Sequence, residues 1–202
     1  MLMRPLTIRF SAPKSDGTTS LEACIRKRRS VREFAEDSLT KDDVGQLLWA
    51  AQGITGESEK RAVPSAGALY PLTLGAVIGK VPSVPAGVYR YTVSQHRLAA
   101  VSAGDDRARL AAAALDQQWI ASAPAIIFIA GAIDRTMAKY GNRGRRYVYL
   151  EAGHAAENVM LQAVSLGLAS TMIGAFSDAD VSHLLTLDSW ETPLCLLPVG
   201  RA

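Results

Sequence analysis

The chain of 202 residues has few cysteines and few aromatic side chains, and it lacks any long apolar run. Its two cysteines, Cys24 and Cys195, lie far apart and form no CxxC or Cys/His spacing, so the sequence supports neither a disulfide framework nor a metal site. The longest apolar run, residues 123–133, is too short to cross a bilayer, and the start MLMRPLTIRF has no apolar core of signal-peptide length. We therefore expect a cytoplasmic protein without membrane contact.

The sequence also has no large excess of positive or negative charge. The 22 lysines and arginines are nearly balanced by 19 aspartates and glutamates, which leaves a net charge of +3. A protein that binds polyanions in general usually carries a larger net positive charge, so we expect no nucleic-acid partner. The glycine-rich patterns GxGxxG and GxxxxGK[ST] are absent as well, so any nucleotide must be held in another way. The positive charge is instead local, in residues 26–32 (RKRRSVR) and 143–146 (RGRR).

Hydrophobic spacing predicts helices and strands in an irregular order. Residues 1–20 are expected to form a polar lead-in, and residues 21–202 a single domain. Helix starts are indicated by a capping box at 19–22 and by a second start at 40–43, and a further helix is predicted over 105–122. Strands are predicted at 72–78, 87–93, 96–101, 124–131 and 194–200. Strands and long helices without regular βαβ alternation favour an α+β fold.

The longest helical pattern covers residues 147–168 and is small or apolar around most of its circumference. Such a helix must be buried, and in a chain of this size the simplest cover is other helices and a second subunit. Gly167 is expected to end it. Glu151, His154 and Asn158 have the spacing of a polar strip on this helix, although a histidine there is more often a hydrogen-bonded packing residue.

Residues 26–34 (RKRRSVREF) are the first candidate site. By charge alone, the four cations at 26–29 are a solvated helix end, where positive charge interacts favourably with the helix dipole. Ser30 and Arg32 follow with a hydroxyl and another guanidinium, and arginine forks match phosphate oxygens in a bidentate manner. Residues 26–34 therefore form either a solvated helix end or a binding site for a phosphomonoester.

Two further stretches are unremarkable by themselves. PSAGALYP, residues 64–71, has the composition of a turn that enters a strand. Lys139 and Tyr140 stand before a glycine-rich turn, where such residues are usually exposed. Three arginines follow, at 143, 145 and 146. They are either solvated, or they bind an acidic substrate or the phosphates of a nicotinamide cofactor.

Taken in order along the chain, these stretches resemble the nitroreductase superfamily. RRSVREF (28–34) resembles its flavin-phosphate signature, while PSAGALYP (64–71), residues 139–168 and the closing LPVG (197–200) are similar to its SagB/ThcOx-type dehydrogenase branch. The resemblance implies a nitroreductase-like fold, with a central, mostly antiparallel sheet flanked by helices in an intertwined homodimer. It also implies one FMN at each subunit interface.

The resemblance assigns roles to individual residues. Arg28, Ser30 and Arg32 would contact the FMN phosphate and ribityl chain, and Arg201 would reach the phosphate. The loop at 64–71 and the turn at 172–175 would lie against the isoalloxazine. The full set implied to bind FMN is Arg28, Arg29, Ser30, Arg32, Pro64, Ser65, Ala66, Gly67, Leu69, Met172, Ile173, Gly174, Ala175 and Arg201.

The resemblance further implies that Lys139 and Tyr140 are catalytic. In the related azoline oxidases a Lys-Tyr pair removes a substrate proton while FMN accepts a hydride. Many nitroreductases have an asparagine in the loop where this chain has Gly67 and Ala68, which favours the dehydrogenase branch. We expect oxidation of an azoline or a related C–N bond in a small or peptide-derived substrate. The alternatives are an NAD(P)H-dependent nitro or quinone reductase and a non-catalytic flavin-binding redox protein.

Overall fold

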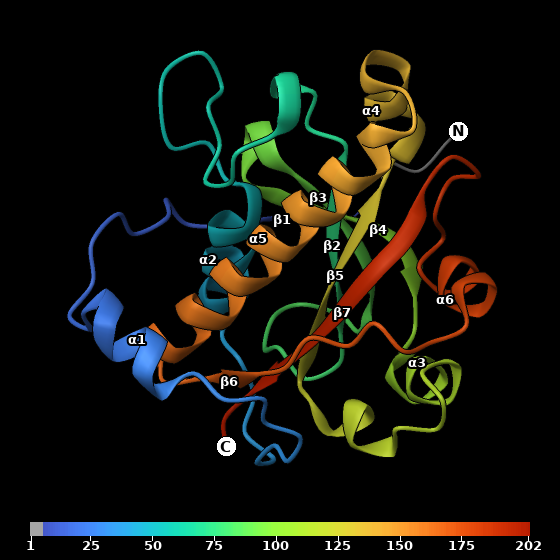
Figure 1. The fold of residues 1–202 in the computed structure, drawn as a ribbon. Coiled ribbons are helices and arrows are strands. Elements are labelled where there is room, and N and C mark those ends of the chain that lie inside the picture. Colours follow the sequence, from blue (N-terminus) through green and yellow to red (C-terminus); the bar gives the residue numbers. More distant parts are fainter. Residues whose placement is uncertain (1–5) are drawn as a thin grey trace.

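The computed structural model describes residues 6–202, which form a seven-stranded sheet with helices on both faces (Figure 1). The strand order is β1-β4-β3-β2-β5-β7-β6, and the described pairings between these strands are antiparallel. The α+β class and the antiparallel sheet flanked by helices are thereby confirmed.

The strands are β1 (Thr7–Arg9), β2 (Leu72–Ile78), β3 (Gly87–Thr92), β4 (Arg97–Ala103), β5 (Ala125–Gly131), β6 (Ala169–Ser170) and β7 (Thr192–Gly200). The α-helices are α1 (Leu21–Lys27), α2 (Lys41–Gln52), α3 (Arg107–Ala113), α4 (Ile133–Tyr140), α5 (Arg143–Ser165) and α6 (Asp178–Leu184). Three 3₁₀ turns complete the described elements: η1 (Ala66–Ala68), η2 (Val93–Gln95) and η3 (Gln118–Ser122).

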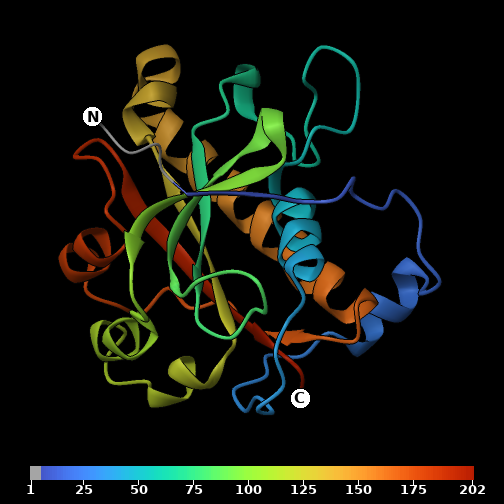
Figure 2. The ribbon, with the colours of Figure 1, turned by 180° about the vertical axis from the view of Figure 1, so that it is seen from behind.

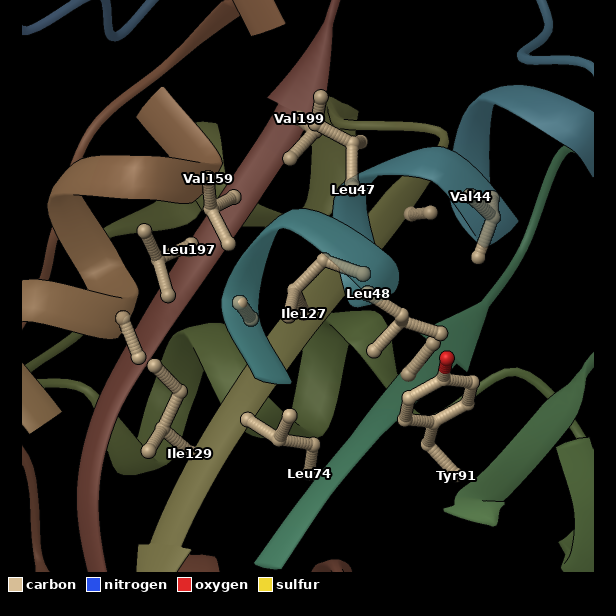
Figure 3. Close-up of a cluster of buried hydrophobic side chains, with 14 of the residues drawn as sticks. Val44, Leu47, Leu48, Leu74, Tyr91, Ile127, Ile129, Val159, Leu197 and Val199 are labelled. Atoms are coloured by element: carbon tan, nitrogen blue, oxygen red, sulfur yellow. The ribbon is translucent and has the colours of Figure 1, made fainter. Parts of the chain in front are cut away.

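Strand β5 separates two apolar cores, because successive side chains of a strand point to opposite faces of the sheet. Ile127 and Ile129 lie in a core that includes residues of α2 and α5, which Figure 3 shows from inside. Ile126 and Phe128 lie in the other core, with residues of α3, η3 and α6. The seven residues of β5 are all buried, as its unbroken apolar sequence predicts.

The register of β5 defines two opposite ends of the sheet. At one end, which we call the η1 end, Gly131 pairs with Leu72 at the start of β2 and with Thr192 at the start of β7. At the other, the β6 end, Ala125 pairs with Val199 beside β6. Six residue steps at about 3.3 Å each place these two ends about 20 Å apart.

The predicted helix over 105–122 is wrong, because the chain breaks there into α3 and η3. Leu115 and Asp116 both have positive φ, 58° and 57°, which ends the helix and turns the chain. The turn lets Ile120 enter the core beneath the sheet, where its side chain is fully buried. A straight helix of that length would extend about 27 Å and carry Ile120 past this core.

Helix starts follow side-chain caps. The helix start predicted at residues 40–43 is confirmed, and it is a capping box: the Thr40 hydroxyl accepts from the backbone N–H of Asp43, and the Asp43 carboxylate accepts from that of Thr40. The box predicted at 19–22 is wrong by one residue: Ser20 is the N-cap, and its hydroxyl accepts from the backbone of Ala23. Either hydroxyl satisfies a free N–H of the first turn, so sequence alone did not separate the two positions.

The lead-in contributes a strand that was not predicted. Thr7–Arg9 pairs with β4 as the edge strand β1, which Figure 2 shows from behind. The side chain of Ile8 is buried. Three residues are too few to show alternation. Further on, the backbone of Lys14 both donates to and accepts from the side chain of Gln46 on α2, which holds this part of the lead-in on the domain.

Helix α5 is longer at its start than the predicted 147–168. It begins at Arg143 and ends at Ser165, and Gly167 has φ +69°, which confirms that this glycine ends the helix. One face is buried against α2 and the sheet, whereas Tyr149 and Leu150 are exposed. The predicted burial around the whole circumference is therefore not achieved within one chain. No helix within residues 6–202 combines the length and hydropathy needed to cross a membrane.

Candidate functional site

The segment after α1 runs along the β6 end of the sheet. Ser30 forms a parallel bridge with Ser170 of β6, and the backbone N–H of Val31 donates to the Ser170 carbonyl at 3.3 Å. A few residues later, the N–H of Ala35 donates to the carbonyl of Arg201 at 2.9 Å. These backbone bonds bring the basic run and the C-terminal arginine to the same end of the molecule.

The arginines at this end differ in how firmly they are held. Arg28 lies 3.5 Å from the carboxylate of Glu157 in a partly exposed ion pair, and the guanidinium of Arg32 lies 6.0 Å from the ring centroid of Trp119. Such exposed contacts contribute little, so an anion can replace them. Arg29 instead donates to two backbone carbonyls at the end of α1, at 3.0 and 2.7 Å. The side chains of Arg28 and Arg32 are therefore freer than that of Arg29, which caps the helix.

The turn at 172–175 follows β6. Ile173 exchanges backbone hydrogen bonds with Leu196 of β7, at 2.8 and 2.9 Å, and its side chain lies in the second core. Met172, Gly174 and Ala175 are exposed. Ile173 thus anchors the turn from inside, and its three neighbours are the ones that face outward.

The PSAGALYP loop lies at the η1 end and is fixed by one serine. The hydroxyl of Ser65 donates to a carboxylate oxygen of Glu151 at 2.6 Å and accepts from the backbone N–H of Tyr70 at 2.9 Å. Between these anchors the chain forms η1, in which Gly67 is exposed and has φ +63°. Pro64 is exposed, while Ala66 and Leu69 are partly buried.

Glu151 supports this loop from below and was not predicted to do so. It is 3% exposed, and its second oxygen accepts from the amide of Gln52 on α2 at 2.9 Å. Burial raises the pKa of the Glu151 carboxyl, while the two hydrogen bonds and the charge of Arg61 oppose that rise. The polar strip predicted on α5 is only partly present: Asn158 also faces α2, but His154 is exposed.

Lys139 and Tyr140, at the end of α4, converge on Gly67. An atom at the Cβ position of Gly67 would lie 2.6 Å from Tyr140 Oη and 2.8 Å from Lys139 Nζ. The ring of Tyr140 also packs edge-on against Tyr147 of α5, with centroids 5.2 Å apart. Gly67 suits this place by its positive φ and by having no side chain that these two flexible side chains would have to avoid, so the amine and phenol ends meet at loop backbone.

The candidate site therefore consists of two half-sites in one chain (Figure 1). The phosphate half-site is formed by Arg28, Ser30, Arg32 and Arg201, next to α1, β6 and the C-terminus. The ring half-site is formed by the loop at 64–70 with Lys139 and Tyr140, next to η1 and α4. They lie at opposite ends of the sheet, the β6 end and the η1 end.

Comparisons with known proteins are consistent in what they match. The model of the Nitroreductase family matches residues 25–201. A protein of Methanocaldococcus jannaschii named as a candidate nitroreductase is 44% identical over 181 residues, which cover 90% of each protein. The trifolitoxin-processing protein TfxB of Rhizobium leguminosarum bv. trifolii is 32% identical over 153 residues, which cover 73% of this chain and 41% of TfxB.

Solved structures share the fold. A candidate nitroreductase from Anabaena variabilis superposes with a TM-score of 0.86 at 28% identity, over 98% of this chain and 42% of that protein. A chain of the Escherichia coli microcin synthetase McbBCD complex, with truncated pro-MccB17 bound, has a TM-score of 0.75 at 22% identity, over 100% of this chain and 77% of that one. The chain thus spans less than half of TfxB and of the Anabaena protein.

Proposed function

The chain belongs to the nitroreductase family of oxidoreductases, whose members generally use FMN, and we propose that it is an FMN-dependent dehydrogenase acting on a C–N bond. The observation that carries this proposal is the convergence of Lys139 Nζ and Tyr140 Oη on the backbone of Gly67. A base and a phenol held together at bare backbone suit proton transfer beside a flat ring.

The residues present fit FMN at both half-sites. Arg28, Ser30 and Arg32 offer guanidinium and hydroxyl donors, which suit a phosphomonoester, and Arg201 lies at the same end. At the ring half-site, Gly67 is exposed and has no side chain that would hold a ring away from the loop.

A homodimer would join the two half-sites. In an isologous dimer the same surface of each copy meets at a twofold axis. An axis across the exposed face of α5, near Tyr149 and Leu150, would place the β6 end of one copy against the η1 end of the other. The phosphate would then be held by one subunit and the ring would lie on the loop of its partner, which is why neither chain alone brings both half-sites together.

Within that site the chain's own residues would handle the proton. Bound FMN supplies hydride acceptance. Lys139, in its neutral form, would take the proton that leaves as the C–N bond is oxidised, and Tyr140 would hydrogen-bond the reacting atom or relay the proton. One hydride and one proton leave the substrate, so the step balances. The name of TfxB, a trifolitoxin-processing protein, supports a peptide-derived substrate.

A second function is favoured by a different observation. The M. jannaschii protein, which matches over 90% of this chain, is named as a nitroreductase. In an NAD(P)H-dependent reductase the same pair would deliver a proton to a nitro or quinone oxygen. The exposed arginines at 143, 145 and 146 would then be available for cofactor phosphates.

The test begins with the visible spectrum of the purified protein and with FMN released on denaturation. Turnover is then compared for a synthetic thiazoline or oxazoline and for NAD(P)H with a nitroaromatic or quinone. We expect Lys139→Ala and Tyr140→Phe to keep FMN and to lose about a hundredfold or more in turnover, which is the usual contribution of general acid–base groups.

Lys80→Ala, which removes an exposed lysine at the β6 end, is the matched control and should leave turnover unchanged. Full activity of the Lys139→Ala variant would remove the base assignment. FMN-loaded protein without turnover on either substrate class would instead indicate a non-catalytic flavin protein, and protein that takes up no FMN would contradict the proposal as a whole.

A further inference from the structure

A cavity of about 450 Å³ opens beside the loop that carries Gly67. Strands β2 and β3 contribute its floor, and Arg61, Tyr70 and Arg135 stand on its rim. Apart from Tyr70 at the end of the loop, none of the residues connected above with FMN or with proton transfer lines this cavity. It is therefore a separate compartment that shares one wall, the loop, with the ring half-site.

Tyr70 holds the two rim arginines together. The guanidinium carbon of Arg61 lies 4.1 Å from the centroid of the Tyr70 ring, and Arg135 Nη1 donates to the Tyr70 carbonyl at 2.8 Å. Tyr70 itself adopts φ +46° and donates its N–H to Ser65. A non-glycine residue in this conformation is strained, so the loop is held in a shape that presents both guanidiniums.

Both guanidiniums have donors to spare. Within residues 6–202 neither Arg61 nor Arg135 forms an ion pair with a carboxylate. Nε of Arg61 is buried without a hydrogen-bond partner, and its Nη1 reaches Gln52 only at 3.4 Å. Burial is also the main cause that lowers the pKa of Arg61. The charges of Glu151 and Glu59 act on Arg61 without an ion pair to it, so this partly buried guanidinium keeps an unpaired Nε that a bound anion would satisfy.

Among the described residues, the other charged side chains near the cavity do not form ion pairs with Arg61 or Arg135. Arg90 is fully engaged, with bonds of 3.1 and 2.6 Å to the carboxylate of Glu191 and another of 3.1 Å to a backbone carbonyl. These two charges neutralise each other. Glu59 is the carboxylate among the lining residues, and it is exposed. Within the lining, Arg61 and Arg135 thus outnumber this one carboxylate, while the buried Glu151 also acts on Arg61.

The cavity lies next to the proposed chemistry. Arg135 and Lys139 are four residues apart on α4, which is about one helical turn, or 6 Å along the axis. Arg135 contacts the loop at Tyr70, and Lys139 contacts it at Gly67. A group bound by Arg135 would therefore lie about one turn from the proton-transferring pair.

We infer that this cavity binds the carboxylate or phosphate group of the molecule that exchanges a hydride with the flavin. The inference rests on the proposed function and adds the class of substrate: an oxyanion anchored by Arg61 and Arg135. The anion could belong to an acidic organic substrate or to the pyrophosphate of a nicotinamide cofactor. The chemistry that recognises it is the same, because arginine forks bind both groups in a bidentate manner.

The test is calorimetric titration of the protein saturated with FMN, which leaves the arginines at the β6 end occupied. The two probes are inorganic pyrophosphate and benzoate. We expect at least one of them to bind, and Arg61→Gln and Arg135→Gln each to raise its Kd about tenfold, or about 1.4 kcal/mol. Tighter binding of pyrophosphate would identify a nicotinamide phosphate as the anion, and tighter binding of benzoate a carboxylated substrate.

Arg109→Gln, which changes an exposed arginine of α3 paired with Asp106, is the control and should keep the Kd of the unmodified protein. Thermal unfolding of each variant checks that it folds, and Arg135 is exposed enough for its variant to do so. Unchanged Kd values in both variants, or no binding of either probe, would overturn the inference. FMN content separates the two claims: a yellow protein with turnover but no anion binding keeps the proposed function and loses only this cavity.

Discussion

At the scale of the residue, a single buried carboxylate decides where the ring half-site lies. Glu151 links α5 to Ser65 of the loop and to Gln52 of α2. The Ser65 hydroxyl in turn holds Tyr70, between the two rim arginines of the cavity. Buried polar groups cost free energy unless they are hydrogen-bonded, and here each bond also orients the next residue. Both the flavin loop and the anion cavity therefore depend on this side chain.

Glu151→Gln tests this dependence through pH. Burial raises the carboxyl pKa above its ordinary value of 4.5, so the folded state binds the proton more tightly than the unfolded state. The stability contribution of this group is fully present below pH 4.5 and is lost as the pH rises through the raised pKa. The glutamine is uncharged throughout and lacks this loss. We expect the Tm of the variant minus that of the unmodified protein to grow with pH across that window, and a constant difference in thermal melts would contradict the assignment.

At the scale of the element, the crossing of α4 and α5 positions Lys139 and Tyr140, the pair proposed to be catalytic. Gly144, in the first turn of α5, packs against the backbone of α4: an atom at its Cβ position would lie 2.7 Å from atoms of Thr136 and Met137. The two helices touch closely because this position has no side chain. Lys139 and Tyr140 follow directly on α4, so their reach to Gly67 depends on that contact.

Gly144→Ala is expected to push α4 away from α5. The obstructing atoms are backbone and cannot rotate aside, so we expect a loss of about 1–3 kcal/mol in the free energy of unfolding, typical of an overpacked contact. Turnover should fall while FMN is retained. Gly56→Ala is the matched control, because its nearest neighbour would be 3.6 Å away, and we expect a change within about 0.5 kcal/mol. Chemical denaturation and turnover of both variants measure this; equal effects would contradict the role of the crossing.

At the scale of the whole molecule, two adjacent helices, α1 and α5, each carry exposed apolar side chains where a partner is expected. Tyr149 and Leu150 project from α5, and Leu21 and Ile25 project from the neighbouring helix α1. Exposed apolar surface of this kind marks interaction sites. A second copy of the chain, related by a twofold axis, would cover this apolar surface. The same twofold axis would bring the phosphate half-site of one copy to the ring half-site of the other.

Leu150→Asp is expected to disrupt that dimer. A carboxylate in the middle of an apolar interface would be buried without a partner, which costs several kcal/mol. Sedimentation or light scattering should show a dimer for the unmodified protein and a monomer for the variant, with loss of bound FMN. Leu115→Asp changes a leucine that is 69% exposed, against 54% for Leu150, but lies in the turn after α3, so it should remain dimeric. A dimer with bound FMN in the Leu150→Asp variant would remove this interface.

The sequence predicted the sheet more accurately than the helices. Residues 72–78 and the core strand at 125–131 lie within one residue of the prediction, because alternation or an unbroken apolar run follows directly from the pleat. Helix ends were less accurate. Ser20 rather than Thr19 caps α1, and two positive φ angles break the chain at Leu115 and Asp116. The positions of these helix ends depend on which side chains pack in the core, and the spacing of apolar residues does not show this.

By itself, then, the sequence determined the class of fold, the end of α5 at Gly167, and the residue types suited to a phosphate and to a proton. The tertiary structure alone decided which of them meet. Lys139 and Gly67 lie far apart in the chain and come together because β2 and β5 are neighbours in the sheet. Arg61 and Arg135 carry no local signal, and the polar-strip spacing of Glu151 does not indicate its partners, since these roles arise from burial and from contacts with other elements. A sequence pattern records the surface that a residue prefers, but contacts across a fold depend on how the whole chain packs.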